Sequence, residues 1–201
     1  MTEIATLPPA AASAARDRLL ETATRIFYAE GVNTVGVERI VSEGHVTRAT
    51  FYRHFPSKQD LVLAYLQTAH DAIEQRIEQL AAAADEPRAL LTAIADDIGE
   101  QLASPHFRGC AFINTAAEFE DAEHPIRRAV AAHRAWFSSV VRDAFAAAGH
   151  PRPGDVARHY VMLRDGAMVG GCLGDPAAAR QSFRHAIDDL LRSTGEPRPV
   201  S

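Results

Sequence analysis

Residues 36–58, GVERIVSEGHVTRATFYRHFPSK, contain two short helical segments joined by a tight turn. The apolar residues of 36–43 recur at helical spacing, and Gly44-His45 then breaks the pattern. A second segment runs from about residue 47 to residue 54, before a proline that ends it. Two short helices in this arrangement predict a helix-turn-helix, in which the first helix braces the second.

The second segment carries the short, polar and basic side chains that entry into a major groove requires. Thr47 is placed to cap it, because its hydroxyl can accept hydrogen bonds from the free N–H groups of the first turn. Helical geometry predicts an outer set of Thr47, Arg48, Thr50, Tyr52, Arg53 and His54, and a packing set of Ala49, Phe51 and Phe55. Spacing alone does not show which residue touches a base.

The sequence on either side of this stretch also has a helical period. A helix from about residue 14 to residue 30 stops at Gly31, and Ser57 and Asp60 form a capping-box-like start for a long helix over 57–83. Breaks that contain Pro or Gly separate further helices, which we expect at 87–103, 110–119, 125–148, 154–169 and 176–193. We find no alternating β-branched run that predicts a strand, so the expected fold class is all-α.

The composition, 47% hydrophobic and 23% charged residues, is that of an ordinary soluble globular protein. No apolar run approaches the length of a membrane span, and the N-terminus has neither the basic nor the apolar region of a signal peptide. Two cysteines, Cys110 and Cys172, are too few for a disulfide scaffold. We therefore expect a reduced, cytoplasmic protein.

The charge distribution is uneven along the chain. The formal net charge of −5 argues against indiscriminate binding to nucleic acid. Residues 45–58 nevertheless contain no acidic side chain and include Arg48, Arg53 and Lys58. A local cationic patch on an acidic protein is expected where a single face meets phosphate.

Residues 19–61 resemble the N-terminal domain of the TetR family of transcriptional regulators. The resemblance rests on Phe27, Gly31, Ile40, the run Val46–Tyr52, His54-Phe55 and Ser57-Lys58. It implies a three-helix DNA-binding domain over 13–72, with the helix-turn-helix at about 36–55, and an effector-binding and dimerisation domain over 73–201. It also implies a homodimeric repressor that binds double-stranded operator DNA and that a small-molecule effector releases.

The resemblance assigns roles to individual residues of the N-terminal domain. Thr47, Arg48 and Thr50 match the groove-facing start of the recognition helix, and Tyr52 and His54 match positions that approach the DNA backbone. Lys58 matches a lysine that clamps phosphate at a helix start. The expected DNA-binding set is Gly36, Val37, Thr47, Arg48, Thr50, Tyr52, Arg53, His54 and Lys58.

The turn departs from the family pattern, which commonly has Ala-Gly where this chain has Gly44-His45. If His45 takes the left-handed conformation that glycine normally supplies, the backbone is strained there, although His tolerates it better than most residues. Otherwise the strain moves to Gly44. The tilt of the recognition helix depends on which alternative holds.

The second half of the chain resembles one TetR subgroup in RGCAFIN at 108–114, Glu118-Phe119, His133 and Trp136. In that family the middle helices enclose an apolar pocket. Asn114 and Glu118 lie four residues apart on an otherwise apolar helix and share a face. They can face an effector, or they can bond the backbone or each other inside the core. The expected effector-binding set is Phe112, Asn114, Glu118 and Trp136.

The last two helices of the family pair across a two-fold axis, which places a homodimer interface within residues 154–193 here. The small residues Gly166, Ala167, Gly170 and Gly171 would allow close helix approach, and Phe183, Ile187, Leu190 and Leu191 offer an apolar stripe. The alternative is that these stripes belong to the core of one protomer.

Other function classes have weaker support. His106 and Cys110 are four apart, but no third ligand follows, so we expect no metal site and no cofactor. Neither a nucleophile elbow nor a phosphate-binding loop occurs, so we do not expect an enzyme. An interaction module that keeps the fold without reading DNA is the other alternative.

Overall fold

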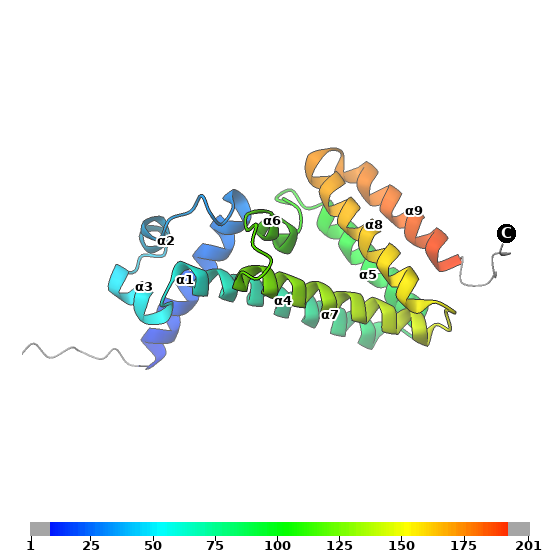
Figure 1. Ribbon diagram of the computed structural model, residues 1–201, viewed down its shortest axis with the longest axis horizontal. Coiled ribbons are helices and arrows are strands. Elements are labelled where there is room, and N and C mark those ends of the chain that lie inside the picture. The colour runs from blue at the N-terminus through cyan, green and yellow to red at the C-terminus, as the bar shows by residue number, and fades with distance from the viewer. Residues whose placement is uncertain (1–8, 193–201) are drawn as a thin grey trace, which may run out of the picture. The chain divides into compact units, whose positions relative to one another are not determined.

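The structure, a computed structural model, describes residues 9–192 and over this range consists of nine helices without a strand (Figure 1). The helices are α1 (Pro9–Glu30), α2 (Val37–Glu43), α3 (Arg48–His54), α4 (Lys58–Ala83), α5 (Pro87–Leu102), α6 (Ala111–Ala117), α7 (Pro125–Ala147), α8 (Pro153–Leu173) and α9 (Pro176–Arg192). The prediction of an all-α fold is confirmed.

The N-terminal unit comprises residues up to Ala69 together with Asn114–Ala129. Within it α1 packs against both α2 and α3, and these two short helices pack against each other. The side chains that fill its core are fully buried: Leu19, Ile26, Ile40, Phe51, Leu61 and Leu66. This core holds the helix-turn-helix on a long preceding helix.

The second unit comprises His70–Ile113 and the residues from Val130 onward. Helices α5, α8 and α9 lie side by side in it (Figure 1). Tyr160 of α8 is fully buried, and its hydroxyl donates to the carbonyl of Leu91 in α5 at 2.9 Å. Burial raises the pKa of this phenol, which therefore stays neutral as a hydrogen-bond donor.

Helix α8 continues to Leu173, so the expected end of this helix at Val169 is wrong. Gly171 lies inside the helix, and a Cβ at this position would come within 2.7 Å of Leu102 Cδ2 in α5. A glycine in a helix costs about 1 kcal/mol relative to alanine. Here the missing side chain allows close packing against α5, which offsets that cost.

The other helix bounds agree with the expected ones to within two residues, except at the start of α1. Helix α1 begins at Pro9 instead of residue 14, while α6, at Ala111–Ala117, is shorter than expected by one residue at its start and two at its end. Gly109, with φ of 89°, precedes α6 in a left-handed conformation. Residue 193, the expected end of the last helix and of the dimer segment, lies outside the described residues. None of the helices within 9–192 combines the length and apolar character needed to cross a membrane.

Candidate functional site: a nucleic-acid interface and a ligand cavity

Gly44 and His45, in the turn between α2 and α3, have different roles. His45 takes the left-handed conformation, with φ of 50°, while Gly44 is right-handed with φ of −79°. The Gly44 N–H donates to the Ile40 carbonyl at 2.9 Å, and a Cβ on Gly44 would lie 2.9 Å from the same oxygen. Glycine therefore provides the close approach, and the strain falls on His45.

Helix α3 is capped as its sequence predicts, and two of the three side chains expected to pack inward do so. Thr47 Oγ1 accepts a hydrogen bond from the Thr50 N–H at 3.1 Å, which confirms the N-cap. Phe51 and Phe55 are buried and hold α3 on the core. The expectation that Ala49 also packs inward is wrong, because it is exposed on the side of α3 opposite Phe51.

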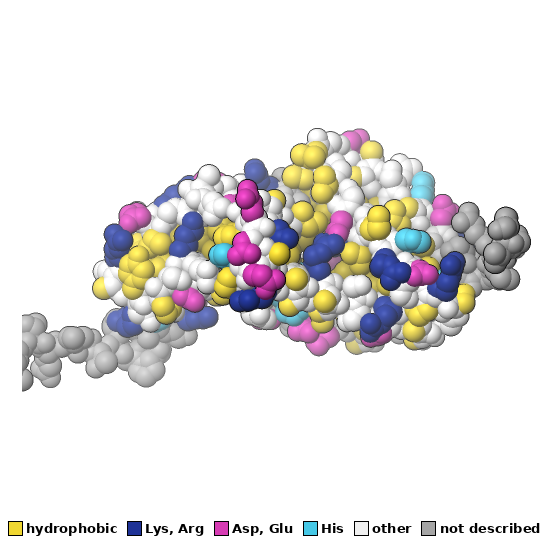
Figure 2. Space-filling model, viewed as in Figure 1, with side chains coloured by type: hydrophobic (Ala, Val, Ile, Leu, Met, Phe, Trp, Pro, Cys, Tyr) yellow, Lys and Arg dark blue, Asp and Glu magenta, His cyan; other side chains and the backbone are white. Residues whose placement is uncertain are grey.

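The outward face of α3 presents Thr47, Arg48, Tyr52 and Arg53, all exposed. Arg48 Nη1 lies 2.9 Å from Glu38 of α2, and its guanidinium lies 5.7 Å from the ring centroid of Tyr52. These contacts extend Arg48 along the surface, and they leave its side chain 64% exposed. Figure 2 shows dark-blue Lys and Arg side chains over α2 and α3.

His54, at the end of α3, differs from its neighbours. Its side chain is partly buried, and within residues 9–192 its buried Nε2 has no hydrogen-bond partner. Burial lowers the pKa of His54, and the positive charges of Arg53 and Arg16 lower it further. The imidazole is therefore a neutral group beside the cationic face.

The start of α4 is a reciprocal capping box, as its sequence predicts. The Asp60 N–H donates to Ser57 Oγ at 3.2 Å, and the Ser57 N–H donates to Asp60 Oδ2 at 2.9 Å. Lys58 stands in the first turn of this helix and is half-buried. Burial lowers the pKa of Lys58, and the nearby Glu118 carboxylate opposes the shift.

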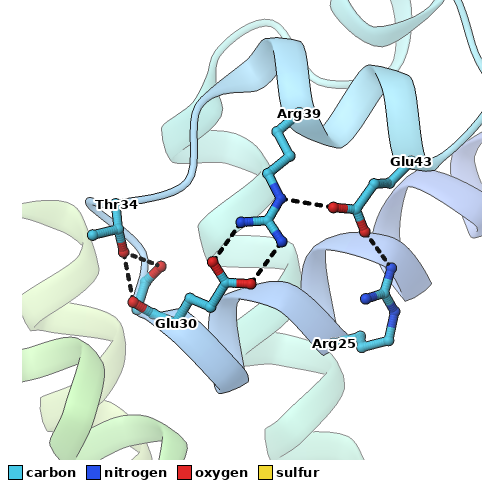
Figure 3. A network of polar contacts seen from close by, with 6 residues as sticks. Arg25, Glu30, Thr34, Arg39 and Glu43 are labelled. Carbon is cyan, nitrogen blue, oxygen red and sulfur yellow. Dashed lines mark hydrogen bonds and ion pairs between the residues drawn. The ribbon is translucent and has the colours of Figure 1, made fainter.

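A network of ion pairs fixes the bracing helix α2 on α1 (Figure 3). Arg39 of α2 donates to both Glu30 of α1 and Glu43 of α2, and Glu43 also accepts from Arg25 of α1. These hydrogen bonds raise the pKa of Arg39 and lower the pKa values of Glu30 and Glu43. The ionised forms of Glu30, Arg39 and Glu43 are thereby favoured at the α1–α2 junction.

Glu118, just after α6, binds the loop between α1 and α2. Its Oε1 accepts from the Val32 N–H at 2.8 Å and its Oε2 from the Asn33 N–H at 2.6 Å. The Asn33 side chain returns a hydrogen bond to the Glu118 carbonyl at 3.0 Å. Gly31, with φ of 91°, precedes this contact, and a Cβ there would lie 3.1 Å from Glu118 Oε1.

The second unit contains a cavity of about 340 Å³ between α4, α5, α7 and α8. Its walls are mainly aliphatic and include Ile73, Ile77, Leu80, Ile94, Ile98 and Met168. Its polar groups are Arg76, Asp97, Gln101 and Arg164. A cavity of this size, apolar with a few polar groups, is typical of a small-molecule site.

Four aromatic side chains form a cluster elsewhere in the same unit. Phe112 stacks on His133 with centroids 3.5 Å apart, and His70 packs against both His133 and Trp136. The two imidazoles meet through their Nδ1 atoms at 3.1 Å. Burial, with added repulsion from Arg164, lowers the pKa of His133 to about 3. This histidine is therefore neutral near pH 7.

The comparisons with known proteins agree with this geometry. A family described as "Bacterial regulatory proteins, tetR family" matches residues 19–65. The crystal structure of SCO4454, a TetR-family transcriptional regulator from Streptomyces coelicolor, is 47% identical with a TM-score of 0.89, and the match covers 92% of this chain and 97% of that one. The chain belongs to the TetR family.

Two further relatives of this TetR-family chain differ in sequence identity and in how much of each chain the match covers. The curated "Uncharacterized HTH-type transcriptional regulator YuxN" of Bacillus subtilis is 34% identical over 70 residues, 35% of this chain and 24% of that protein. A putative regulator from Saccharomonospora viridis, solved in complex with choline, has a TM-score of 0.76 at 22% identity and covers 90% of this chain and 96% of that one. The latter likeness concerns the fold alone. As a family member, the chain is a transcriptional regulator with a DNA-binding helix-turn-helix.

In this TetR-family protein, the expected DNA-binding residues lie together, whereas the expected effector-binding residues do not. The expected DNA-binding residues all lie on α2, α3 and the adjoining ends of the loops and α4, within one unit. The expected effector residues divide between the units, with Asn114 and Glu118 in the first and Phe112 and Trp136 in the second. None of these four is among the residues that line the cavity. Asn114 is exposed, and both Glu118 oxygens hold the α1–α2 loop.

Sequence reasoning missed the polar groups of the cavity, although one signal was present. Arg164 falls on the buried stripe of α8 with Tyr160, Ala167 and Met168, which lie four, three and four residues from it. A charged residue at a core position needs a partner, which marks it as a candidate for function.

Proposed function

We propose that this TetR-family regulator is a homodimeric repressor that binds double-stranded operator DNA and leaves it when a small molecule occupies the second-unit cavity. The observation that carries the proposal is the outward face of α3, where Thr47, Arg48, Tyr52 and Arg53 are exposed beside Lys58 at the start of α4. No acidic residue occurs between His45 and Lys58, so this face suits the phosphates that flank a major groove.

The residues of this face divide by role. Thr47, Arg48 and Thr50, at the first turn of α3, are proposed to read base edges. Contacts to phosphate are proposed for Gly36, Val37, Tyr52, Arg53, His54 and Lys58. Arg48 has to leave Glu38 to reach a base, and this exposed ion pair costs little to break.

The proposed dimer pairs α8 and α9 with the same helices of a second copy. Met162, Val169 and Leu173 of α8 are large hydrophobic side chains with exposed fractions of 71%, 44% and 83%. Gly166 and Gly170 lie on the same face and are exposed, with no crowding around either. Figure 2 shows hydrophobic side chains gathered at the turn between α8 and α9. Such a face is favourable for close helix pairing in a homodimer.

The proposed effector site is the cavity of about 340 Å³ in the second unit. The choline complex of the Saccharomonospora viridis regulator supports the idea that this fold holds small organic molecules. The domain division we propose is thus DNA binding in 13–72 and effector binding and pairing in 73–201.

The decisive experiment is a footprint on the DNA upstream of the chain's own gene, followed by affinity measurements on the protected duplex. Arg48→Ala should cost about 1–3 kcal/mol and relax the preference at one base pair. Lys58→Ala should weaken every duplex alike and reduce the slope of log affinity against log salt by about one. Arg142→Ala, an exposed arginine of α7, is the matched control. Equal, sequence-blind losses for Arg48→Ala and Arg142→Ala would reject the proposed interface.

A further inference from the structure

The cavity of the second unit contains a buried charge. Arg164 of α8 lines the cavity and is 7% exposed, and its guanidinium lies 5.3 Å from the ring centroid of Phe137, which also lines it. The surrounding wall is largely aliphatic. A guanidinium is always ionised in proteins, and burial without a counter-charge is expensive.

The charges around Arg164 do not balance. Arg164 Nη1 donates to Asp165 Oδ1 at 2.9 Å, but Arg134 Nη2 donates to the other oxygen of the same carboxylate at 2.6 Å. The remaining hydrogen bond of Arg164 within residues 9–192 goes to Cys110 Sγ at 3.3 Å, and a thiol is a weak acceptor. One carboxylate therefore serves two guanidinium groups. Of the five N–H donors of Arg164, two are occupied.

The acidic group that lines the cavity already has partners. Asp97 is the acidic residue among the described residues that line it. Its Oδ1 accepts from Arg76 Nε at 2.5 Å and its Oδ2 from Gln101 Nε2 at 2.8 Å. Both carboxylate oxygens are engaged, and the group is paired with a positive charge. A cationic ligand would find no available counter-charge here.

We propose that the cavity binds an apolar monocarboxylate, with the carboxylate on the Arg164 guanidinium and the apolar body along the walls formed by Ile73, Ile77, Ile94 and Ile98. The ligand supplies the missing negative charge, and Arg–carboxylate pairs gain geometric fit from parallel N–H donors. A volume of about 340 Å³ suits a medium-chain aliphatic acid. This assignment rests on the proposed function, because it names the effector class of the same site.

The test is calorimetry on the full chain without DNA, with three probes of equal length: octanoate, octanamide and octylammonium. The wild type should bind octanoate at least tenfold more tightly than octanamide, and it should not bind octylammonium measurably. Arg164→Gln should remove this preference while leaving octanamide affinity unchanged. Arg142→Gln is the control, because it deletes an exposed guanidinium of α7 in the same unit that neither lines the cavity nor pairs with Asp165. It should retain the preference.

The comparison of the three probes on the wild-type protein tests the proposed ligand class even if Arg164→Gln fails to fold. Equal affinities for octanoate and octanamide, tighter binding of octylammonium, or no binding of octanoate would each overturn the assignment. Loss of the preference in Arg142→Gln to the same extent as in Arg164→Gln would also overturn it. The measurements use no DNA, so failure to find an operator would reject the proposed function without affecting this result.

Discussion

At the scale of single residues, His45 carries the backbone strain of the helix-turn-helix. Its φ of 50° is a conformation that glycine adopts freely and that a Cβ disfavours by about 1 kcal/mol or more. We expect His45→Gly to raise the free energy of unfolding by about 0.5–1 kcal/mol, measured by urea denaturation. His45→Ala keeps the Cβ and is the control. An equal gain in both variants would show that the histidine ring, not the backbone, is the source.

Glu118 holds the loop between α1 and α2 through hydrogen bonds to its backbone. Its carboxylate accepts two backbone N–H groups, from Val32 and Asn33, and a glutamine side chain has a single carbonyl oxygen. Glu118→Gln therefore places an NH₂ group against a backbone N–H, and we expect a loss of about 1–3 kcal/mol in unfolding free energy. Glu120→Gln, at an exposed position nearby, should change it little. Equal melting midpoints for the two variants would contradict the structural role.

The residue scale also shows where sequence reasoning stops. Helical spacing placed Asn114 and Glu118 on a shared face, and it left open whether they meet a ligand or the backbone. For Glu118 the partners lie 85 and 86 residues away in the chain, in a loop whose amide directions depend on the left-handed turn at Gly31. Local patterns contain no information about such a pairing. The caps at Thr47 and Ser57 were predictable because both partners lie within three residues.

At the scale of elements, Pro and Gly residues marked the ends of most helices. The prediction failed where a glycine lies inside a helix and allows close packing. Gly44 ends α2, whereas Gly171 lies inside α8 against Leu102. The same residue type has opposite meanings because tertiary contact overrides intrinsic propensity. The buried contact also removes Gly171 from the set of small residues expected at a dimer seam, while Gly166 and Gly170 stay exposed.

Helix α8 supports a direct test of the dimer. Leu173 and Met162 are already exposed in the protomer, so a charge there should not disturb its core. We expect Leu173→Glu and Met162→Glu to yield folded monomers, because paired copies would bury unpaired carboxylates at the seam. Sedimentation gives the mass and circular dichroism checks the fold. Ala131→Glu, at an exposed site on α7, should stay dimeric. A stable dimer for both α8 variants would move the interface elsewhere.

At the scale of the whole molecule, two long helices belong to both compact units. The boundary falls within α4 after Ala69, within the short helix α6 after Ile113 and within α7 after Ala129, so residues 114–129 group with the N-terminal unit. The sequence suggested a single cut at 72/73, because a pattern read along the chain divides it in chain order. We propose that the long helices α4 and α7 are the route by which occupancy of the cavity alters the DNA-binding unit.

Coupling between the cavity and the operator site has to act in both directions. If a cavity ligand weakens operator binding by some factor, the operator must weaken ligand binding by the same factor. With octanoate as the probe, we expect a factor of about 5–150, corresponding to a coupling of about 1–3 kcal/mol. Calorimetry would compare octanoate binding to the free dimer and to the dimer saturated with operator duplex. Arg48→Ala, at a duplex concentration too low to bind it, should behave as the free protein in both titrations. An octanoate affinity that is identical with and without bound operator would rule out release of the operator by octanoate, because a ligand with equal affinity for two states shifts neither.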